Sequence, residues 1–381
     1  MSRAGTAPER PDPATIDPAT YLRERYQDVR NRNRALRGFY AVKPLLPRRL
    51  QLAARRLYAR RQGRRRFPAW PIEPLLVEHQ NEELRRRLRE SHEDRLPIVN
   101  FWPDGRRFAV VVTHDVESSA GAENVQPLLE LERRHGIVSS WNFVAEDYPI
   151  PAGLFDRVRA AGGEVGLHGV THDGKLFGDR QTFDAQLVKI HRYLHDWDAV
   201  GFRSPGTRRN VDWMPELGCL YDSSFPDTDP FEPQPGGCCS ILPYFLGDLV
   251  ELPITLPQDH TLWEILRVRS IDVWRRKADW VIAHHGLINV IIHPDYVIDP
   301  ERLRLYDELL AYLRGQIDRD HGWHALPREV ASWWKARAAL HVARASGETV
   351  RIEGGSGADG YVERATVAWA HERDGVITIA S

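Results

Sequence analysis

The sequence predicts an α/β fold whose parallel strands close, or nearly close, into a barrel. Between residues 107 and 344, short apolar runs alternate with segments of helical periodicity, which is the pattern of repeated βα units. The runs at 108–113 and 287–292 are apolar except for Thr113 and Asn289, as expected for strands that are buried on both faces of a parallel sheet. About seven such runs occur, and this number favours a closed barrel over an open sheet.

The elements are expected in a regular order. Strands are expected at 108–113, 137–144, 164–167, 199–202, 220–222, 249–254 and 287–292. Helices are expected at 124–135, 153–161, 181–195, 271–285, 301–318 and 328–344. The pattern then changes to short strands at 349–352, 365–371 and 376–380, with Asp374-Gly375 as a hairpin turn.

Composition divides the 381 residues into four parts. Residues 1–20 hold four prolines among small and charged residues and are expected to be a disordered tail. Residues 21–95 form a basic, Arg-rich helical arm, residues 96–344 the barrel, and residues 345–381 a small β appendage. The net charge of −1 conceals an asymmetry, because residues 1–95 sum to +11 and the rest to −12.

This asymmetry bears on possible partners. The acidic barrel argues against a nucleic-acid enzyme, because binding phosphates requires a basic surface. Between Arg23 and Arg66 there are 16 basic residues and only two acidic ones. Three readings of residues 21–66 stay open: a solvated arm packed on its own domain, a peripheral contact with an anionic membrane surface, or a site for an acidic partner.

The expected location is the cytoplasm, with the inner membrane face as a variant of it. The first residues contain no apolar segment of the kind found in signal peptides, and no stretch is long and apolar enough to cross a bilayer. The three cysteines, Cys219, Cys238 and Cys239, form no C-x-x-C pair, which fits a reducing compartment.

Two histidines, His168 and His172, follow the strand expected at 164–167. With 16 histidines in the chain, roughly one H-x-x-x-H pair is expected by chance, and His191 and His195 form another on an expected helix. The first pair differs because ionisable groups follow four other strands, and strand ends carry the reactive residues of βα barrels. These groups are His114, Asp115 and Glu117, then Arg203, then Asp222, and finally His293 and Asp295.

Taken in order, these residues resemble the NodB-homology polysaccharide deacetylases, which are metal-dependent N-deacetylases on a distorted (β/α)7 barrel. The resemblance covers roughly residues 107 to 328. The motifs that carry it are Thr113-His114-Asp115-Val116-Glu117, His168-Gly169-Val170-Thr171-His172, Arg203-Ser204-Pro205-Gly206 and Ile291-Ile292-His293, with Tyr221-Asp222-Ser223-Ser224 and Glu251-Leu252-Pro253 as further phrases common in the family.

The resemblance implies a hydrolase that removes an acetyl group from an N-acetylated sugar or glycan precursor. Its divalent metal ion, zinc in the first place and otherwise cobalt, nickel, manganese or iron, would be bound by His168, His172 and Glu117. Asp115 would be the base, held by Arg203. His293 would be the general acid, with Asp222 or Asp295 tuning its pKa.

The first motif departs from the family pattern. Val116 stands where the family usually has its metal-binding second aspartate, and Glu117 is one residue further and one methylene longer. Residues two apart on an extended strand point to the same side, so Glu117 is the expected ligand and His114 the next substitute.

Three alternatives remain. Another amide or cyclic-ureide hydrolase could use the same barrel. Two histidines and a carboxylate also suit Fe(II) oxygenases, although a base and an acid would be superfluous there. The chain could also be a glycan-binding protein without catalytic activity.

Overall fold

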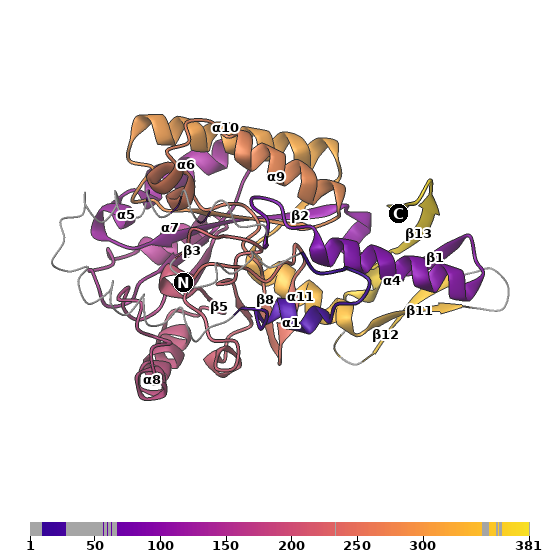
Figure 1. The fold of residues 1–381 in the computed structure, drawn as a ribbon. Helices are drawn as coiled ribbons and strands as arrows, with labels where there is room; N and C mark the ends of the chain where they lie inside the picture. The colour runs from indigo at the N-terminus through magenta and orange to yellow at the C-terminus, as the bar shows by residue number, and fades with distance from the viewer. Residues whose placement is uncertain are drawn as a thin grey trace, which may run out of the picture.

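The structure is a computed structural model, and it describes residues 10–27, 67–232, 234–344, 350–355 and 360–380, together with residues 56, 59, 62 and 357. Figure 1 shows a large α/β body, with a group of smaller strands at the end opposite to helices α5 and α7. Most of the basic segment at 21–66 lies outside the described residues, so its expected helix is not described. No helix within the described ranges is long and apolar enough to cross a membrane.

The large body is built on one curled sheet. Its parallel strands β2 (Phe108–Val116), β3 (Ser140–Phe143), β4 (Glu164–Leu167), β5 (Gly201–Phe202), β6 (Tyr221–Asp222) and β8 (Leu249–Glu251) are neighbours in that order. Strand β9 (Leu287–Ile292) pairs with the other edge of β2. The segment after β8 comes close to β9, because Leu256 N donates to Asn289 O over 3.1 Å and Asn289 Nδ2 donates to Leu252 O over 3.1 Å. The sheet is therefore curled towards a distorted barrel.

Two short strands add to the expected set. Strand β10 (Gly322–His324) runs parallel to the start of β2, and β7 (Tyr244–Leu246) runs antiparallel to β8. The sheet of the described residues therefore has nine strands rather than the expected seven. Three residues are too few to show a periodic apolar pattern, so neither strand could be recognised in the sequence.

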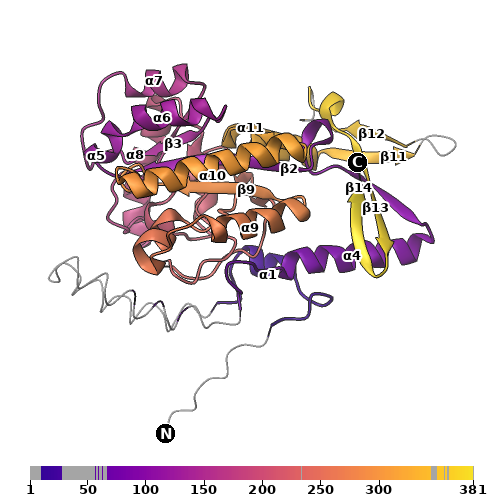
Figure 2. The same cartoon turned by 90° about the horizontal axis from the view of Figure 1, so that it is seen from above.

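Helices cover the outside of the sheet. They are α5 (Ser119–Glu123), α6 (Val125–Arg134), α7 (Leu154–Ala160), α8 (Arg180–Asp196), α9 (Asp272–Ala283), α10 (Pro300–Arg319) and α11 (Pro327–Ala338). Helices α9 and α10 cover the part of the sheet that holds β2 and β9 (Figure 2). In α10, Asp299 caps the first turn, and Leu305, Leu309 and Leu313 form a buried stripe at a spacing of four. Each such leucine contributes about 2 kcal/mol through burial.

The expected helix at 328–344 ends earlier than predicted. Helix α11 stops at Ala338, and the chain then forms β11 (Leu340–Arg344), which pairs antiparallel with β12 (Val350–Gly354). The strand pairing overrides the helical pattern of residues 340–344. The expected end of the barrel at residue 344 is therefore too late.

The C-terminal appendage includes a strand that precedes the barrel in the sequence. Strand β1 (Arg95–Val99) pairs with β13 (Val367–Arg373), which pairs with β14 (Val376–Ala380) through the expected turn at Asp374-Gly375. Helix α4 (Leu75–Ser91) packs Leu84 and Leu88 against Leu96, Ala370 and Ile377. The appendage is thus not formed by residues 345–381 alone, because its third strand and its covering helix lie at residues 75–99.

The described part of the N-terminus packs on the barrel. Helix α1 (Pro18–Leu22) is capped by Asp17, and Glu24 forms a buried ion pair with Arg209, with 2.5 Å between Oε1 and Nη2. His79 contacts Pro13 O at 2.8 Å. Residues 10–20, expected as part of a disordered tail, therefore make defined contacts.

Candidate metal centre and active site

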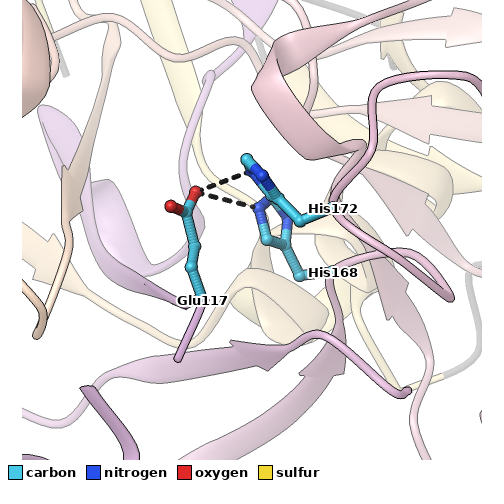
Figure 3. A group of neighbouring side chains, drawn as sticks. All are labelled: Glu117, His168 and His172. Carbon is cyan, nitrogen blue, oxygen red and sulfur yellow. Dashed lines mark ion pairs between the residues drawn. The ribbon is translucent and has the colours of Figure 1, made fainter. Parts of the chain in front are cut away.

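Three metal-ligating side chains meet at the carboxyl ends of β2 and β4. Glu117 directly follows β2, His168 directly follows β4, and His172 lies four residues further along the loop. One ligand atom from each of the three lies within 4.8 Å of the others. Figure 3 shows the Glu117 carboxylate facing both imidazole rings, with Oε1 at 2.8 Å from His172 Nε2 and 3.6 Å from His168 Nε2. A tetrahedral zinc ion with ligands at about 2.1 Å places neighbouring ligand atoms about 3.4 Å apart.

One ring nitrogen of His168 is presented in the state that a metal ion requires. His168 Nδ1 lies 3.1 Å from the backbone oxygen of Arg203, so this nitrogen carries the proton and leaves Nε2 with a free lone pair. Nε2 of His168 is buried and makes no hydrogen bond, and the buried Nε2 of His172 has only the Glu117 carboxylate beside it. Buried polar atoms are normally satisfied by several partners, so two imidazole nitrogens facing one carboxylate oxygen fit a metal site.

A glycine allows the loop to carry His172 back to His168. Gly169 has a φ of +71°, which a residue with a side chain rarely adopts. A Cβ atom there would also lie 2.7 Å from Cγ of Pro205. The backbone N–H of His172 then donates to Asp147 Oδ2 over 2.6 Å, which fixes the far end of the turn.

Asp115 lies two residues before Glu117 on the same side of β2. Its Oδ1 accepts hydrogen bonds from Arg203 Nη1 and Asn142 Nδ2, each at 3.0 Å, and its Oδ2 lies 3.9 Å from His168 Nε2. Burial alone would raise the pKa of Asp115, but Arg203 and then His168 and His293 outweigh it and lower that pKa to about 2. Asp115 is therefore an ionised carboxylate with one oxygen turned towards the site.

Arg203 is itself fixed on every side. It is 1% exposed, and its Nε and Nη2 donate to Ser223 O and Ser223 Oγ over 2.7 and 2.8 Å. Its Nη1 also donates to Thr113 Oγ1 over 2.8 Å. A rigid guanidinium holds Asp115 in one orientation, as the family resemblance implied.

His293 faces the cluster from the end of β9. Its Nε2 lies 3.5 Å from Glu117 Oε1, and its Nδ1 lies 2.6 Å from Oδ1 of the buried Asp259. Asp259 Oδ2 also accepts the backbone N–H of His293 over 2.7 Å. Burial would lower the pKa of His293, but Asp259 and then Glu117 outweigh it and raise that pKa well above its usual value.

Asp259 is the functional residue that the sequence interpretation missed. It precedes a seven-residue π-helix, His260–Leu266, a rare conformation that often occurs at functional sites. The available signal was a carboxylate just after the apolar run 252–256, in the same way that the other site residues follow strands. Strand β8 ends at Glu251, however, well before Asp259. Asp259 therefore does not lie directly at the end of a strand, as the other site residues do.

The Glu117 carboxylate lies between His293 and the two histidines His168 and His172. Burial would raise its pKa, but the imidazoles of His168, His172 and His293 outweigh burial and hold the pKa of Glu117 well below its usual value. The carboxylate is therefore ionised, and β2 stays extended up to Val116, which lets the longer side chain reach the histidines.

His114, the substitute ligand expected from the sequence, does not take part in the cluster. Its side chain points to the opposite side of β2, because neighbouring residues of a strand alternate. Nδ1 lies 3.0 Å from Ile292 O, Nε2 lies 2.5 Å from Glu132 Oε1, and the ring stacks on Trp141 at 3.9 Å between centroids. The expectation that His114 replaces a missing ligand is wrong.

Asp222 and Asp295 also lie elsewhere than expected. Asp222 accepts hydrogen bonds from the backbone and hydroxyl of Ser224 and lies beside Glu251, and burial raises the pKa of both carboxyls. Asp295 accepts hydrogen bonds from Glu117 N and Ser118 Oγ. The carboxylate beside His293 is Asp259, so the expected tuning of His293 by Asp222 or Asp295 is corrected.

No family model matches the chain, and no curated protein matches its sequence. Among solved structures, the chain is similar to a Mycobacterium smegmatis protein described as a polysaccharide deacetylase, with 22% identity and a TM-score of 0.49 over 65% of this chain and 97% of that one. It is also similar to PuuE allantoinase, with 18% identity and a TM-score of 0.48 over 62% of this chain and 92% of that one.

A third similar structure is a Pseudomonas aeruginosa PAO1 protein described as a polysaccharide deacetylase, with 18% identity and a TM-score of 0.47 over 61% of this chain and 92% of that one. Similarity of this degree does not assign an activity, so the proposal below rests on the site's own residues.

Proposed function

We propose that this protein is a metal-dependent hydrolase that removes an acetyl group from an N-acetylated sugar or glycan precursor. One observation carries the proposal. An ionised carboxylate, Asp115, and a histidine held by a carboxylate, His293, lie beside the same ligand cluster at Glu117, His168 and His172. Hydrolysis of an amide requires this combination, because its carbonyl is a poor electrophile and its amine a poor leaving group.

Glu117, His168 and His172 would hold the ion. A divalent cation held there would polarise the amide carbonyl and lower the pKa of its bound water to about 7. Asp115 accepts the proton of the attacking water on Oδ2, because Oδ1 is already occupied by Arg203 and Asn142. The low pKa of Asp115 keeps this oxygen unprotonated at neutral pH.

His293 serves the other half of the reaction. Its Nδ1 is committed to Asp259, so Nε2 is the atom that faces the cluster and donates a proton to the departing amine. Asp259 raises the pKa of His293 and so favours the protonated ring. The base and the acid thus approach the amide from different strands, β2 and β9.

The test combines metal analysis with acetate release. We expect one divalent ion per chain in the natural protein and in the Asp115→Asn variant, and loss of the ion in His172→Ala. His195→Ala is the matched control, because His195 belongs to an H-x-x-x-H pair of the same spacing but is exposed on α8. Acetate release should be abolished by Asp115→Asn and His172→Ala and retained by His195→Ala. A folded natural protein without stoichiometric metal would refute the proposal.

A substrate panel separates the remaining alternatives. N-acetylated glycans and sugar nucleotides should release acetate, whereas cyclic ureides should be inert. Hydrolysis of cyclic ureides without acetate release would assign the other amide-hydrolase class. Metal-dependent glycan binding without turnover would indicate a binding protein.

We also propose that the basic residues between 21 and 66 bring the enzyme to a precursor at the inner membrane face. The proposal rests on the 16 basic residues between Arg23 and Arg66. Replacing Arg48 and Arg49 by Gln should reduce co-sedimentation with vesicles containing phosphatidylserine, and neutral phosphatidylcholine vesicles are the control. Equal sedimentation with both kinds of vesicle would exclude this contact.

A further inference from the structure

Glu117 departs from the family motif, and its backbone N–H is hydrogen-bonded to a residue in the loop after another strand. The segment after β2 would be free to turn once the strand ends at Val116. It is fastened instead to the loop after β9, where Asp295 Oδ2 accepts the backbone N–H of Glu117 over 3.3 Å. Asp295 Oδ1 accepts the hydroxyl hydrogen of Ser118. One carboxylate thus holds two consecutive residues.

Other contacts join the same two segments. Asn124 Nδ2 donates to Pro294 O over 2.9 Å, next to Asp295 in the chain. Ser118 Oγ also accepts the N–H of Gly121 over 3.3 Å and caps α5. A Cβ atom on Gly121 would lie 2.3 Å from Asp295 Oδ2, so the carboxylate occupies the space that any larger residue would need.

From these contacts we propose that Asp295 is a positioning residue that presents Glu117 to the metal ion. The inference rests on the metal site of the proposed function. A glutamate has one more rotatable bond than an aspartate, so a ligand of this length requires a fixed backbone to keep its carboxylate on the histidines. Asp295 supplies that fixed point, two residues after the acid His293. The ligand and the acid are thereby set relative to each other through one loop.

Asp295 accepts hydrogen bonds from a backbone N–H and a hydroxyl group, whereas Asp259 contacts a ring nitrogen of His293. Its two oxygens are both engaged, one with Glu117 N and one with Ser118 Oγ. Removing it should therefore change how well Glu117 reaches the ion, while His168 and His172 keep their places through Arg203 O and Asp147.

The first experiment measures Co²⁺ and Zn²⁺ dissociation constants, using the visible spectrum of bound Co²⁺ and competition with a chromophoric chelator. Asp295→Ala should weaken metal binding about 10- to 100-fold, the usual range for groups that orient a ligand. Asp295→Asn should have a smaller effect, because one acceptor oxygen remains. The Co²⁺ spectrum should change in intensity, since a displaced carboxylate alters the coordination geometry.

The matched control is Asp299→Ala, four residues further along the same loop. Asp299 accepts the N–H groups of Glu301 and Arg302 and caps α10. Its loss should lower the melting temperature but leave the metal dissociation constants within about twofold of the natural protein.

A second variant tests the same contact with Asp295 in place. Gly121→Ala should displace the Asp295 carboxylate and weaken metal binding, although alanine is a better helix former than glycine. In the Asp295→Ala background the same change should have little further effect, so the two effects should not add. If Asp295→Ala does not fold, Gly121→Ala carries the test.

The outcomes are distinct. Metal binding by Asp295→Ala and Gly121→Ala equal to that of the natural protein would overturn this inference and leave the proposed function intact. A natural protein that binds no metal would overturn both. Weakened and non-additive binding in these variants, with normal binding in Asp299→Ala, would support the inference.

Discussion

Two histidine–carboxylate pairs lie on opposite sides of the sheet, and only one of them faces the candidate site. His293 and Asp259 leave one ring nitrogen, Nε2, facing the ligand cluster. In the other pair, His114 uses Nε2 for Glu132 and Nδ1 for Ile292 O, and Glu132 is also bound by Tyr306 and Ser139. His114 lies in β2 and His293 follows β9, and both are buried.

The two pairs differ in whether one ring nitrogen of the histidine faces the ligand cluster. A histidine with both nitrogens occupied by protein groups stabilises the fold, because a buried polar network is favourable only when it is complete. A histidine with one nitrogen turned to a ligand cluster can transfer a proton. The comparison predicts opposite consequences for substitutions in the two pairs.

The largest effect, a loss of kcat, is expected from a substitution of His293. His293→Gln should lower kcat for acetate release about 10²- to 10⁴-fold, because the leaving amine loses its proton donor. Metal content should stay near that of the natural protein. Steady-state kinetics with metal analysis provides the measurement, and a kcat within threefold of the natural value would remove His293 from the mechanism.

A substitution in the His114–Glu132 pair should instead lower the free energy of unfolding. His114→Leu leaves the Glu132 carboxylate buried without its imidazole partner, and we expect a loss of about 3 kcal/mol in the free energy of unfolding. Urea denaturation measures this loss, and metal affinity should be kept. Loss of metal with unchanged stability would contradict the comparison and return His114 to the site.

A third buried acid, Glu164, lies at the start of β4, at the end opposite to His168. Burial raises its pKa from 4.5 to about 7, although Tyr221 and Arg328 partly oppose the shift. Since the folded state binds the proton more tightly, the stabilisation is complete below pH 4.5 and is lost as the pH rises through about 7. The change amounts to about 3 kcal/mol.

The check is the pH dependence of urea unfolding in the natural protein and in Glu164→Gln. The variant should lack this decrease between pH 4.5 and 7, and the difference between the two curves isolates the group from all others. Parallel curves would show that Glu164 ionises normally in the folded protein.

The smallest effect is expected at the partner of the catalytic histidine. Asp259→Asn keeps the ring of His293 but weakens its orientation, so kcat should fall roughly 10- to 100-fold, less than after removal of the ring itself. KM and metal content should change little. A decrease equal to that of His293→Gln would show that the ring cannot act without its carboxylate.

Much of the barrel could be predicted from periodicity. The strands at 164–167 and 287–292 have the predicted bounds, and α6, α7 and α10 begin and end within two residues of them. In these segments the local sequence pattern agrees with the burial in the structure. Strands β5, β6 and β8 are shorter than expected. Strands β1 and β10 were missed because their pairing partners are distant in the chain, whereas β7 pairs with the neighbouring β8 but has only three residues.

The appendage shows the same limit. Its hairpin turn at Asp374-Gly375 follows from local preference, and both residues have positive φ values in the structure. Its third strand comes from Arg95–Val99, more than 260 residues before its partner β13. No local rule connects two segments so far apart.

By itself the sequence determined the α/β class, the strand ends that carry Asp115, Glu117, His168, Arg203 and His293, and the alternation that puts Asp115 and Glu117 on one side of β2. Those properties depend on residue type and on the period of a strand. Only the tertiary structure decided that Asp259 holds His293, that Asp295 holds Glu117, and that His114 is sealed against Glu132. The physical reason is that hydrogen bonds between loops depend on where the strands place those loops in space.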